Sequence, residues 1–347
     1  MLPPRGALGE QDPALTMAAK SAAADDVAAQ DLSSDQIYAA SSKVVRRLFV
    51  AAASLTDESQ GARLPIEELV EASHRILRKI DAGNGLIAKA VGSYPDTKHF
   101  ILPHSVNVAI LSQRIARQLE LEPRELETLC LAALAHDVGT VRIPDRIFNK
   151  PDSLSGDEWE VMRQRPRHSY DILCTLGPDY RSVAEIAYQV HERLDGSGYP
   201  RQLKVDEIAI EASIIGAVDI FEAFIHPRPY KKTVPAAAMY GVDNLMRMSH
   251  QFGDSVLKAL VRSIGLFPVG TYVKLNSGEV AQVFESKQHN PMRPTVDVLF
   301  DTQDRRIKRG KTIDLMQTPH LYVFRPLSAE DLRELGLLKE AREGSRR

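Results

Sequence analysis

The segment LCLAALAHDVG, residues 129–139, is the part of the sequence that decides the fold. Seven apolar residues lead directly into His136 and Asp137, and Gly139 then ends the predicted helix. A polar or charged side chain at the end of such an apolar helix is costly to bury unless it is paired or bound to a metal. We therefore expect an imidazole and a carboxylate at the rim of a helical core.

Apolar residues recur at helical spacing on both sides of this segment. Residues 36–95 show the spacing without any chemical motif, and we expect two or three helices that pack or dimerise, with a sensor role as the alternative. Residues 96–265 continue the helical pattern, and the segment Ser155 to Glu158 predicts a capping box that opens one of the helices. Residues 1–35 lack a steady apolar period and are expected to form a flexible tail.

The pattern changes from helix to strand after Pro268. Turn residues 276–278 separate residues 271–275 from residues 279–284, which predicts a β-hairpin. Two further apolar runs would add strands, and together they predict a small β module over residues 266–325; these runs are residues 296–300 and 321–324.

Two more segments complete this part of the chain. Residues 326–347 are expected to contain a short helix that opens at Ser328 and covers residues 332–341, followed by a tail. We interpret the basic stretch 305–311 as a solvated loop, with an electrostatic docking patch as the alternative.

The composition and charge of the chain bear on which partners it binds and on where in the cell it is found. The chain has 347 residues, a formal net charge of −2, and no overall basic bias that would indicate nucleic acid or an anionic membrane surface. No apolar run is long enough to span a bilayer, and no signal-peptide pattern opens the sequence. The two cysteines, Cys130 and Cys174, form no CxxC motif and are expected to be reduced. We therefore expect a cytoplasmic protein.

Other polar residues accompany the His136–Asp137 pair. His104 heads an amphipathic helix, and Asp219 follows the apolar run 214–218, where a lone ionised carboxylate would be expensive. With His136 and Asp137 they would supply two nitrogen and two oxygen ligands, a set that suits Mn, Fe, Ni or Zn better than Ca or Mg. We interpret five scattered histidines as ordinary surface or core residues: His74, His226, His250, His289 and His320.

The segment HERLDGSGYP, residues 191–200, is the most specific motif. It occurs in a fixed order with other short motifs: His104–Ser105, residues 135–139, residues 143–145, Lys150–Pro151, Asp219 and residues 228–231. In this order the motifs resemble an HD-GYP domain, a subgroup of the HD phosphohydrolase superfamily, over about residues 100–265. The resemblance implies a mainly α fold, an HD-type helical bundle with helices before it and a small β module after it.

The resemblance also implies a chemistry. Members of this family hold two or three metals in the core of the bundle and hydrolyse cyclic di-GMP to linear pGpG or to GMP. The implied ligands are His104, His136, Asp137 and Asp219, with His191 as a further one, and the implied catalytic residue is Asp137, at the position that bridges metals. Tyr199 would lie beside the substrate, and Arg228 and Lys231 would bind its phosphates.

Four positions depart from the family pattern. Thr140 replaces a lysine, Arg165 and Val190 replace histidines, and Phe100 replaces an acidic residue. Valine cannot ligate a metal and arginine repels one, so we expect one divalent metal, with a second only if His168 moves into the site.

Three functions remain open on these grounds. The first is a cyclic di-GMP phosphodiesterase, impaired by the lost ligands. The second is an inactive domain that binds nucleotides or partner proteins in signalling. The third is a one-metal phosphohydrolase that acts on another nucleotide. Homodimerisation through the N-terminal helices is a further expectation.

Overall fold

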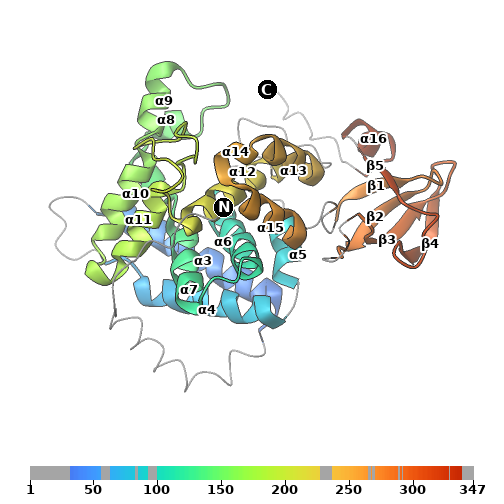
Figure 1. Cartoon of the computed structure of the whole chain (residues 1–347), viewed down its shortest axis with the longest axis horizontal. Coiled ribbons are helices and arrows are strands. Elements are labelled where there is room, and N and C mark those ends of the chain that lie inside the picture. Colours follow the sequence, from blue (N-terminus) through green and yellow to red (C-terminus); the bar gives the residue numbers. More distant parts are fainter. Residues whose placement is uncertain are drawn as a thin grey trace, which may run out of the picture.

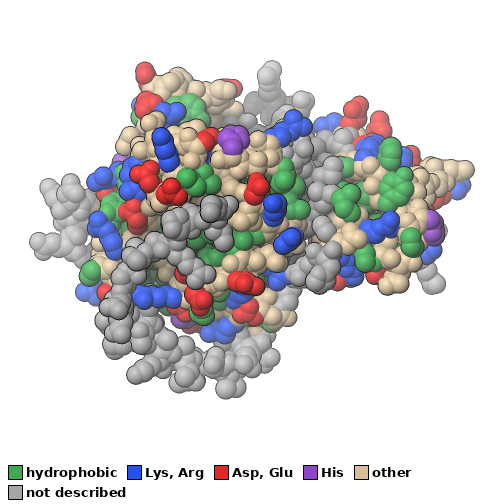
Figure 2. Space-filling view, viewed as in Figure 1, with side chains coloured by type: hydrophobic (Ala, Val, Ile, Leu, Met, Phe, Trp, Pro, Cys, Tyr) green, Lys and Arg blue, Asp and Glu red, His purple; other side chains and the backbone are tan. Residues whose placement is uncertain are grey.

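The computed structural model describes most of the chain, and its description covers residues 32–55, 63–82, 85–92, 100–226, 237–264, 267, 270–287, 290, 292–327 and 329–337. The fold is mainly helical, with a small antiparallel sheet at the C-terminal end, as the sequence predicted (Figure 1). Lys, Arg, Asp and Glu side chains are intermingled over the face seen in Figure 2, in keeping with the nearly neutral net charge.

Among the described residues, three helices precede the segment that carries the sequence motifs. They are α3 (Ser34–Ala53), α4 (Ile66–Ala82) and α5 (Gly85–Gly92). Ser33 and Gln36 form a capping box that starts α3. The apolar faces of α3 and α4 enter the same hydrophobic core as the later helices, so the N-terminal helices pack directly on the helical body. The domain boundaries inferred from the sequence remain predictions.

The helical body continues from residue 101 to residue 264. Its α-helices are α6 (Ile101–Gln118), α7 (Pro123–Ala135), α8 (Asp145–Phe148), α9 (Gly156–Met162), α10 (Arg165–Cys174), α11 (Arg181–Gln189), α12 (Ile210–Ile225), α13 (Ala237–Arg247), α14 (Ser249–Phe252) and α15 (Asp254–Ile264). Two 3-10 helices, η2 (Val138–Arg142) and η3 (Pro178–Tyr180), lie between them. The predicted capping box of Ser155 and Glu158 opens α9.

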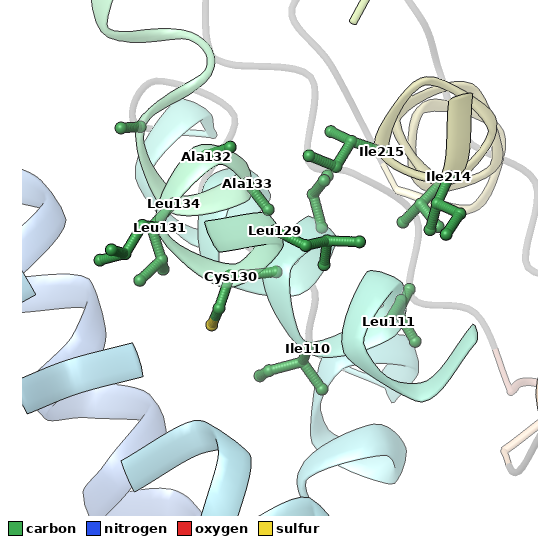
Figure 3. Close-up of a cluster of buried hydrophobic side chains, with 14 of the residues drawn as sticks. Ile110, Leu111, Leu129, Cys130, Leu131, Ala132, Ala133, Leu134, Ile214 and Ile215 are labelled. Atoms are coloured by element: carbon green, nitrogen blue, oxygen red, sulfur yellow. The ribbon is translucent and has the colours of Figure 1, made fainter. Parts of the chain in front are cut away.

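The apolar run that opened the sequence argument forms the buried half of α7. Leu129 and Leu134 are fully buried there, and Leu129 extends from α7 toward Ile214 and Ile215 of α12 (Figure 3). This packing fixes the C-terminal end of α7 in the centre of the bundle, where His136 and Asp137 follow. Among the described residues, no helix is both long enough and apolar enough to cross a membrane.

Five strands form one antiparallel sheet in the order β4-β3-β2-β1-β5. They are β1 (Tyr272–Leu275), β2 (Val280–Glu285), β3 (Thr295–Phe300), β4 (Arg306–Asp314) and β5 (Val323–Pro326). The predicted hairpin is β1 with β2, and the two further predicted strands are β3 and β5.

The prediction of a loop over residues 305–311 was wrong, because most of that stretch belongs to strand β4. The strand pairs through its backbone with β3, for example at Val296 and Ile313. It lies at the edge of the sheet, where lysine and arginine are tolerated and hinder pairing with another chain. The charged side chains of this stretch gave no strand pattern, although its backbone pairs with β3.

The C-terminal helix also differs from its prediction. Helix α16 spans Ala329–Glu334 and so begins and ends earlier than the predicted 332–341, while Ser328 and residues 338–347 lie outside the described residues. Gly336 has a φ of 64°, and the amide of Leu337 donates to the carbonyl of Leu332. This is a Schellman motif, in which a glycine after the last turn terminates the helix.

Candidate metal centre

Four segments of the helical body bring polar side chains to one buried place. His104 comes from α6, His136 and Asp137 follow α7, His191 follows α11, and Asp219 comes from α12. All five are buried, and the most exposed, Asp219, has only 8% of its surface accessible. The structure thus brings together all five residues inferred as ligands, and their role as ligands stays a prediction.

Three of these residues form a compact cluster. One ligand atom each from His104, His136 and Asp137 lies within 4.8 Å of the others. Asp137 Oδ2 is 3.8 Å from His104 Nε2 and 3.6 Å from His136 Nε2, and Asp219 Oδ1 is 3.2 Å from His104 Nε2. Two imidazole nitrogens and one carboxylate oxygen therefore lie close enough to share a metal, and Asp219 adjoins them at His104.

The hydrogen bond at Nδ1 of each imidazole ring determines that Nε2 is the nitrogen that can bind a metal. His104 Nδ1 lies 2.6 Å from Glu222 Oε2, and His136 Nδ1 lies 2.8 Å from the carbonyl oxygen of Ala133. A carbonyl or a carboxylate accepts, so each Nδ1 carries the proton and each Nε2 keeps a lone pair. His136 Nε2 is buried and makes no hydrogen bond to any described residue. This donor set fits a divalent metal.

The electrostatics keep these groups in the protonation states that a metal needs. Burial lowers the pKa of His136, which keeps its imidazole neutral. Burial alone would raise the pKa of Asp137, but Arg165 and the neighbouring histidines outweigh it and hold the pKa of that carboxyl well below its usual range. His136 is therefore a neutral nitrogen donor and Asp137 an ionised carboxylate near neutral pH.

Arg165 is the departure from the family pattern that lies inside the site. Its Nε is 3.2 Å from Asp137 Oδ1, its Nη1 donates to Asp137 Oδ2 at 3.4 Å, and its Nη2 is 2.7 Å from His191 Nε2. Thr140 hydrogen-bonds to the backbone of Asp137. Burial lowers the pKa of His168, and the nearby positive charge of Arg142 lowers it further. The charged groups that act on His168 are thus Arg142 and Asp171, and not Asp137.

Helix α10 is held against the His136–Asp137 turn, and this contact places Arg165. Ser169 Oγ donates to the carbonyl of His136 at 2.6 Å and accepts from the amide of Gly139 at 2.8 Å. A Cβ on Gly139 would collide with the Arg165 carbonyl and the Ser169 amide. Glycine at position 139 is therefore a requirement of close helix packing as well as a helix breaker.

The loop after His191 is braced from within. Glu192 is buried and accepts from the amides of Arg201 and Leu203 at 2.7 and 3.0 Å. The ring of Tyr199 stacks on the ring of His191, with centroids 5.1 Å apart and an interplanar angle of 7°. Tyr199 therefore lies at the edge of the cluster. Arg228 and Lys231, the predicted phosphate-binding residues, lie outside the described residues.

The sequence reasoning missed a group of hydrogen-bonded residues behind His104, centred on Glu222. Glu222 is buried on α12 and receives hydrogen bonds from His104 and from Asn107 Nδ2, while His226 Nδ1 lies 2.9 Å from its Oε1. Burial alone would raise the pKa of Glu222, but His104 and His226 hold it well below the usual value. The signal that found Asp219, a carboxylate in the apolar α12 sequence, applied equally to Glu222 three residues later.

Comparison with known proteins identifies this arrangement. Residues 95–255 match the HD domain family, and residues 272–335 match the KOW domain associated with the HD domain. The cyclic di-GMP phosphodiesterase PA4108 of Pseudomonas aeruginosa is 32% identical over 235 residues, which are 67% of this chain and 56% of that protein. The 3'3'-cGAMP-specific phosphodiesterase 3 of Vibrio cholerae is 36% identical over 156 residues, 45% of this chain and 34% of that protein.

A solved structure shows the same fold. Bd1817, a HDG"Y"P protein from Bdellovibrio bacteriovorus, superposes with a TM-score of 0.52 at 17% identity, over 65% of this chain and 70% of that one. This chain is thus an HD-domain protein with a small KOW-type β module after the helices. Within that class it belongs to the HD-GYP family, as its motifs and the relatives named as cyclic di-GMP phosphodiesterases indicate. The chain spans about half the length of these curated relatives.

Proposed function

We propose that this chain is a metal-dependent phosphodiesterase that hydrolyses cyclic di-GMP to linear pGpG or to GMP. The observation that carries the proposal is the cluster of His104, His136 and Asp137, whose ligand atoms lie within 4.8 Å of one another in the buried centre of the bundle. Two relatives whose names state this activity share 32% identity with the chain, over 235 and 211 residues.

The residues present have distinct parts in such a reaction. A divalent metal bound by His104, His136, Asp137 and Asp219 would lower the pKa of a coordinated water and polarise a phosphoryl oxygen. Glu222 and the Ala133 carbonyl fix the ring orientation of the two histidines. The carboxyl of Asp137 stays ionised and would bind the metal through an oxygen.

Other residues would bind and orient the substrate. Tyr199 is held by its stacking on His191 and would contact the nucleotide at the edge of the cluster. Arg228 and Lys231 would bind the anionic phosphates through a guanidinium and an ammonium group. A cytoplasmic location, a homodimer and signalling-protein partners remain predictions.

A second candidate function is a binding module without turnover. The observation that favours it is the contact of Arg165 with both Asp137 and His191, because a guanidinium there leaves fewer ligand atoms for metals. A third candidate, hydrolysis of another nucleotide, is supported by the relative named for 3'3'-cGAMP.

Metal content and turnover measured together separate these candidates. The purified chain would be loaded with Mn(II) or Fe(II), analysed for metal, and incubated with cyclic di-GMP, 3'3'-cGAMP and pGpG. We expect bound metal and product from cyclic di-GMP, with both reduced in Asp137→Asn and neither reduced in Asp152→Asn, a change at an exposed carboxylate. Metal without product from any nucleotide would support the binding module, and product from 3'3'-cGAMP alone would support the third candidate.

A further inference from the structure

Arg165 occupies a particular position among the residues inferred as ligands. It is the first residue of α10, and its side chain is only 12% exposed. Its guanidinium contacts the carboxylate of Asp137 on one side and the imidazole of His191 on the other. A permanent positive charge is therefore buried between two groups that a metal would otherwise use.

The direction of the Arg165–His191 contact follows from the chemistry of the two groups. A guanidinium has only donors, so Nη2 donates and His191 Nε2 accepts, at 2.7 Å. The ring proton of His191 then lies on Nδ1, which faces Asp219 Oδ2 at 3.6 Å. The lone pair that His191 would offer to a metal is thus already used.

Arg165 contacts both oxygens of the Asp137 carboxylate. Its Nε lies 3.2 Å from Oδ1, and its Nη1 donates to Oδ2 at 3.4 Å. Oδ2 also faces His136 Nε2 and His104 Nε2, at 3.6 and 3.8 Å, and is the oxygen nearer to the proposed metal position. A second divalent cation on the Arg165 side would meet like charge and would find the His191 lone pair occupied.

We propose that Arg165 is a built-in cation that takes the place of a second metal. The site then holds one divalent metal, bound by His104, His136, Asp137 and Asp219, and His191 holds Arg165 instead of acting as a ligand. The inference rests on the metal site of the proposed function, although it does not depend on turnover or on the identity of the substrate.

The test is the number of metal ions per chain, measured with manganese. Wild type, Arg165→His and Arg165→Lys would be saturated with Mn(II), freed of excess metal and analysed for manganese per chain. Electron paramagnetic resonance would then distinguish an isolated Mn(II) ion from an exchange-coupled pair. We expect one isolated ion in the wild type and in Arg165→Lys, which keeps the positive charge. We expect a second, coupled ion in Arg165→His, where Asp137, His191 and the new histidine supply three ligands.

Arg167→His is the matched control, because Arg167 lies on the same helix, is exposed and pairs with Asp171. It should bind one ion, as the wild type does. Two coupled ions in the wild type would overturn the inference even if the Arg165 variants fail to fold. One ion in a folded Arg165→His protein would also overturn it, because Arg165 would then not be what limits the count.

The outcomes also separate this inference from the proposed function. One ion per chain without hydrolysis of cyclic di-GMP would leave the inference standing and reject the phosphodiesterase. Absence of metal in both the wild type and Arg165→His would reject the metal site, and the inference with it.

Discussion

Glu222 and His104 form a short buried hydrogen bond, 2.6 Å from Oε2 to Nδ1, across two helices that are far apart in the sequence. Glu222 accepts the ring proton and so directs His104 Nε2 toward Asp137 and Asp219. Carboxylates behind a ligating histidine commonly fix its tautomer and strengthen its donor nitrogen. Glu222 is therefore a positioning residue of the proposed metal centre.

Replacement of Glu222 by glutamine should weaken metal binding. The amide keeps the size of the side chain but loses the negative charge, and changes of this kind behind a ligand typically cost about 10-fold to 100-fold in metal affinity. Titration of Mn(II) against a competing chelator would measure the change. The matched control is Glu211→Gln, on the same helix but away from the cluster. Equal metal affinities for Glu222→Gln and the wild type would contradict the assigned role.

The hydrogen-bonded layer continues from Glu222 to the N-terminal helices. Asn107 Nδ2 donates to Glu222 Oε1 at 3.1 Å, and the hydroxyl of Tyr38 donates to Asn107 Oδ1 at 2.7 Å. Tyr38 belongs to α3, so the first described helix is joined to the metal centre through two side chains. This is a physical link between a region without chemical motifs and the site itself.

Tyr38→Phe should lower the free energy of unfolding by about 1 kcal/mol, because it removes one buried hydrogen bond and leaves the Asn107 oxygen with one donor fewer. Urea denaturation of the metal-free protein would measure this loss. The same change at the half-exposed Tyr322 in the β module should have little effect. If Tyr38→Phe also weakens Mn(II) binding, the link acts on the site; an unchanged free energy of unfolding would count against a structural role for the hydroxyl.

The sequence predicted the cluster because it is costly to bury a polar or charged side chain in an apolar helix unless it is paired or bound to a metal. His136, Asp137 and Asp219 were singled out as polar groups in apolar helices. The structure places the first two in one cluster with His104, and Asp219 lies 3.2 Å from His104. Periodicity also predicted the helices and the β1–β2 hairpin, since these depend on local patterns. The assignment of His104 needed the order of motifs, because a histidine at the start of a helix is by itself an ordinary feature.

What the sequence could not supply depends on contacts between distant residues. Glu222 contacts His104, 118 residues away, and Arg165 contacts His191, 26 residues away, and no local pattern specifies such pairs. Arg165 was interpreted as a lost ligand that repels a metal, and its contacts with Asp137 and His191 could not be predicted from the sequence. Strand β4 was missed because its charged side chains lie on an edge strand whose pairing is made by the backbone.

Gly139→Ala should destabilise the fold and disturb the site. The added methyl group would meet the Arg165 carbonyl and the Ser169 amide, which are backbone atoms that cannot rotate away. Overpacking of this kind costs about 1–3 kcal/mol. Thermal denaturation would show a lower Tm for Gly139→Ala than for Gly156→Ala, where a Cβ has open space. Equal Tm values for the two variants would show that α10 can move away without cost.

The two cysteines should differ in their reaction with a thiol reagent. Cys130 is fully buried on α7, and burial raises the pKa of its thiol to about 12. A thiol ionises only as the pH approaches its pKa, so at pH 8 about one part in ten thousand of Cys130 is the reactive thiolate, and the helices also exclude the reagent. Cys174 is only partly buried.

Ellman's reagent at pH 8 should therefore react with one thiol per chain in the native protein and with two in guanidinium chloride. Cys174→Ser should abolish the native signal, whereas Cys130→Ala should leave it unchanged. Two equivalents released rapidly from the native protein would mean that α7 opens to solvent. Because α7 leads into His136 and Asp137, such opening would also expose the metal centre, and the reaction of Cys130 would then report on the integrity of the site.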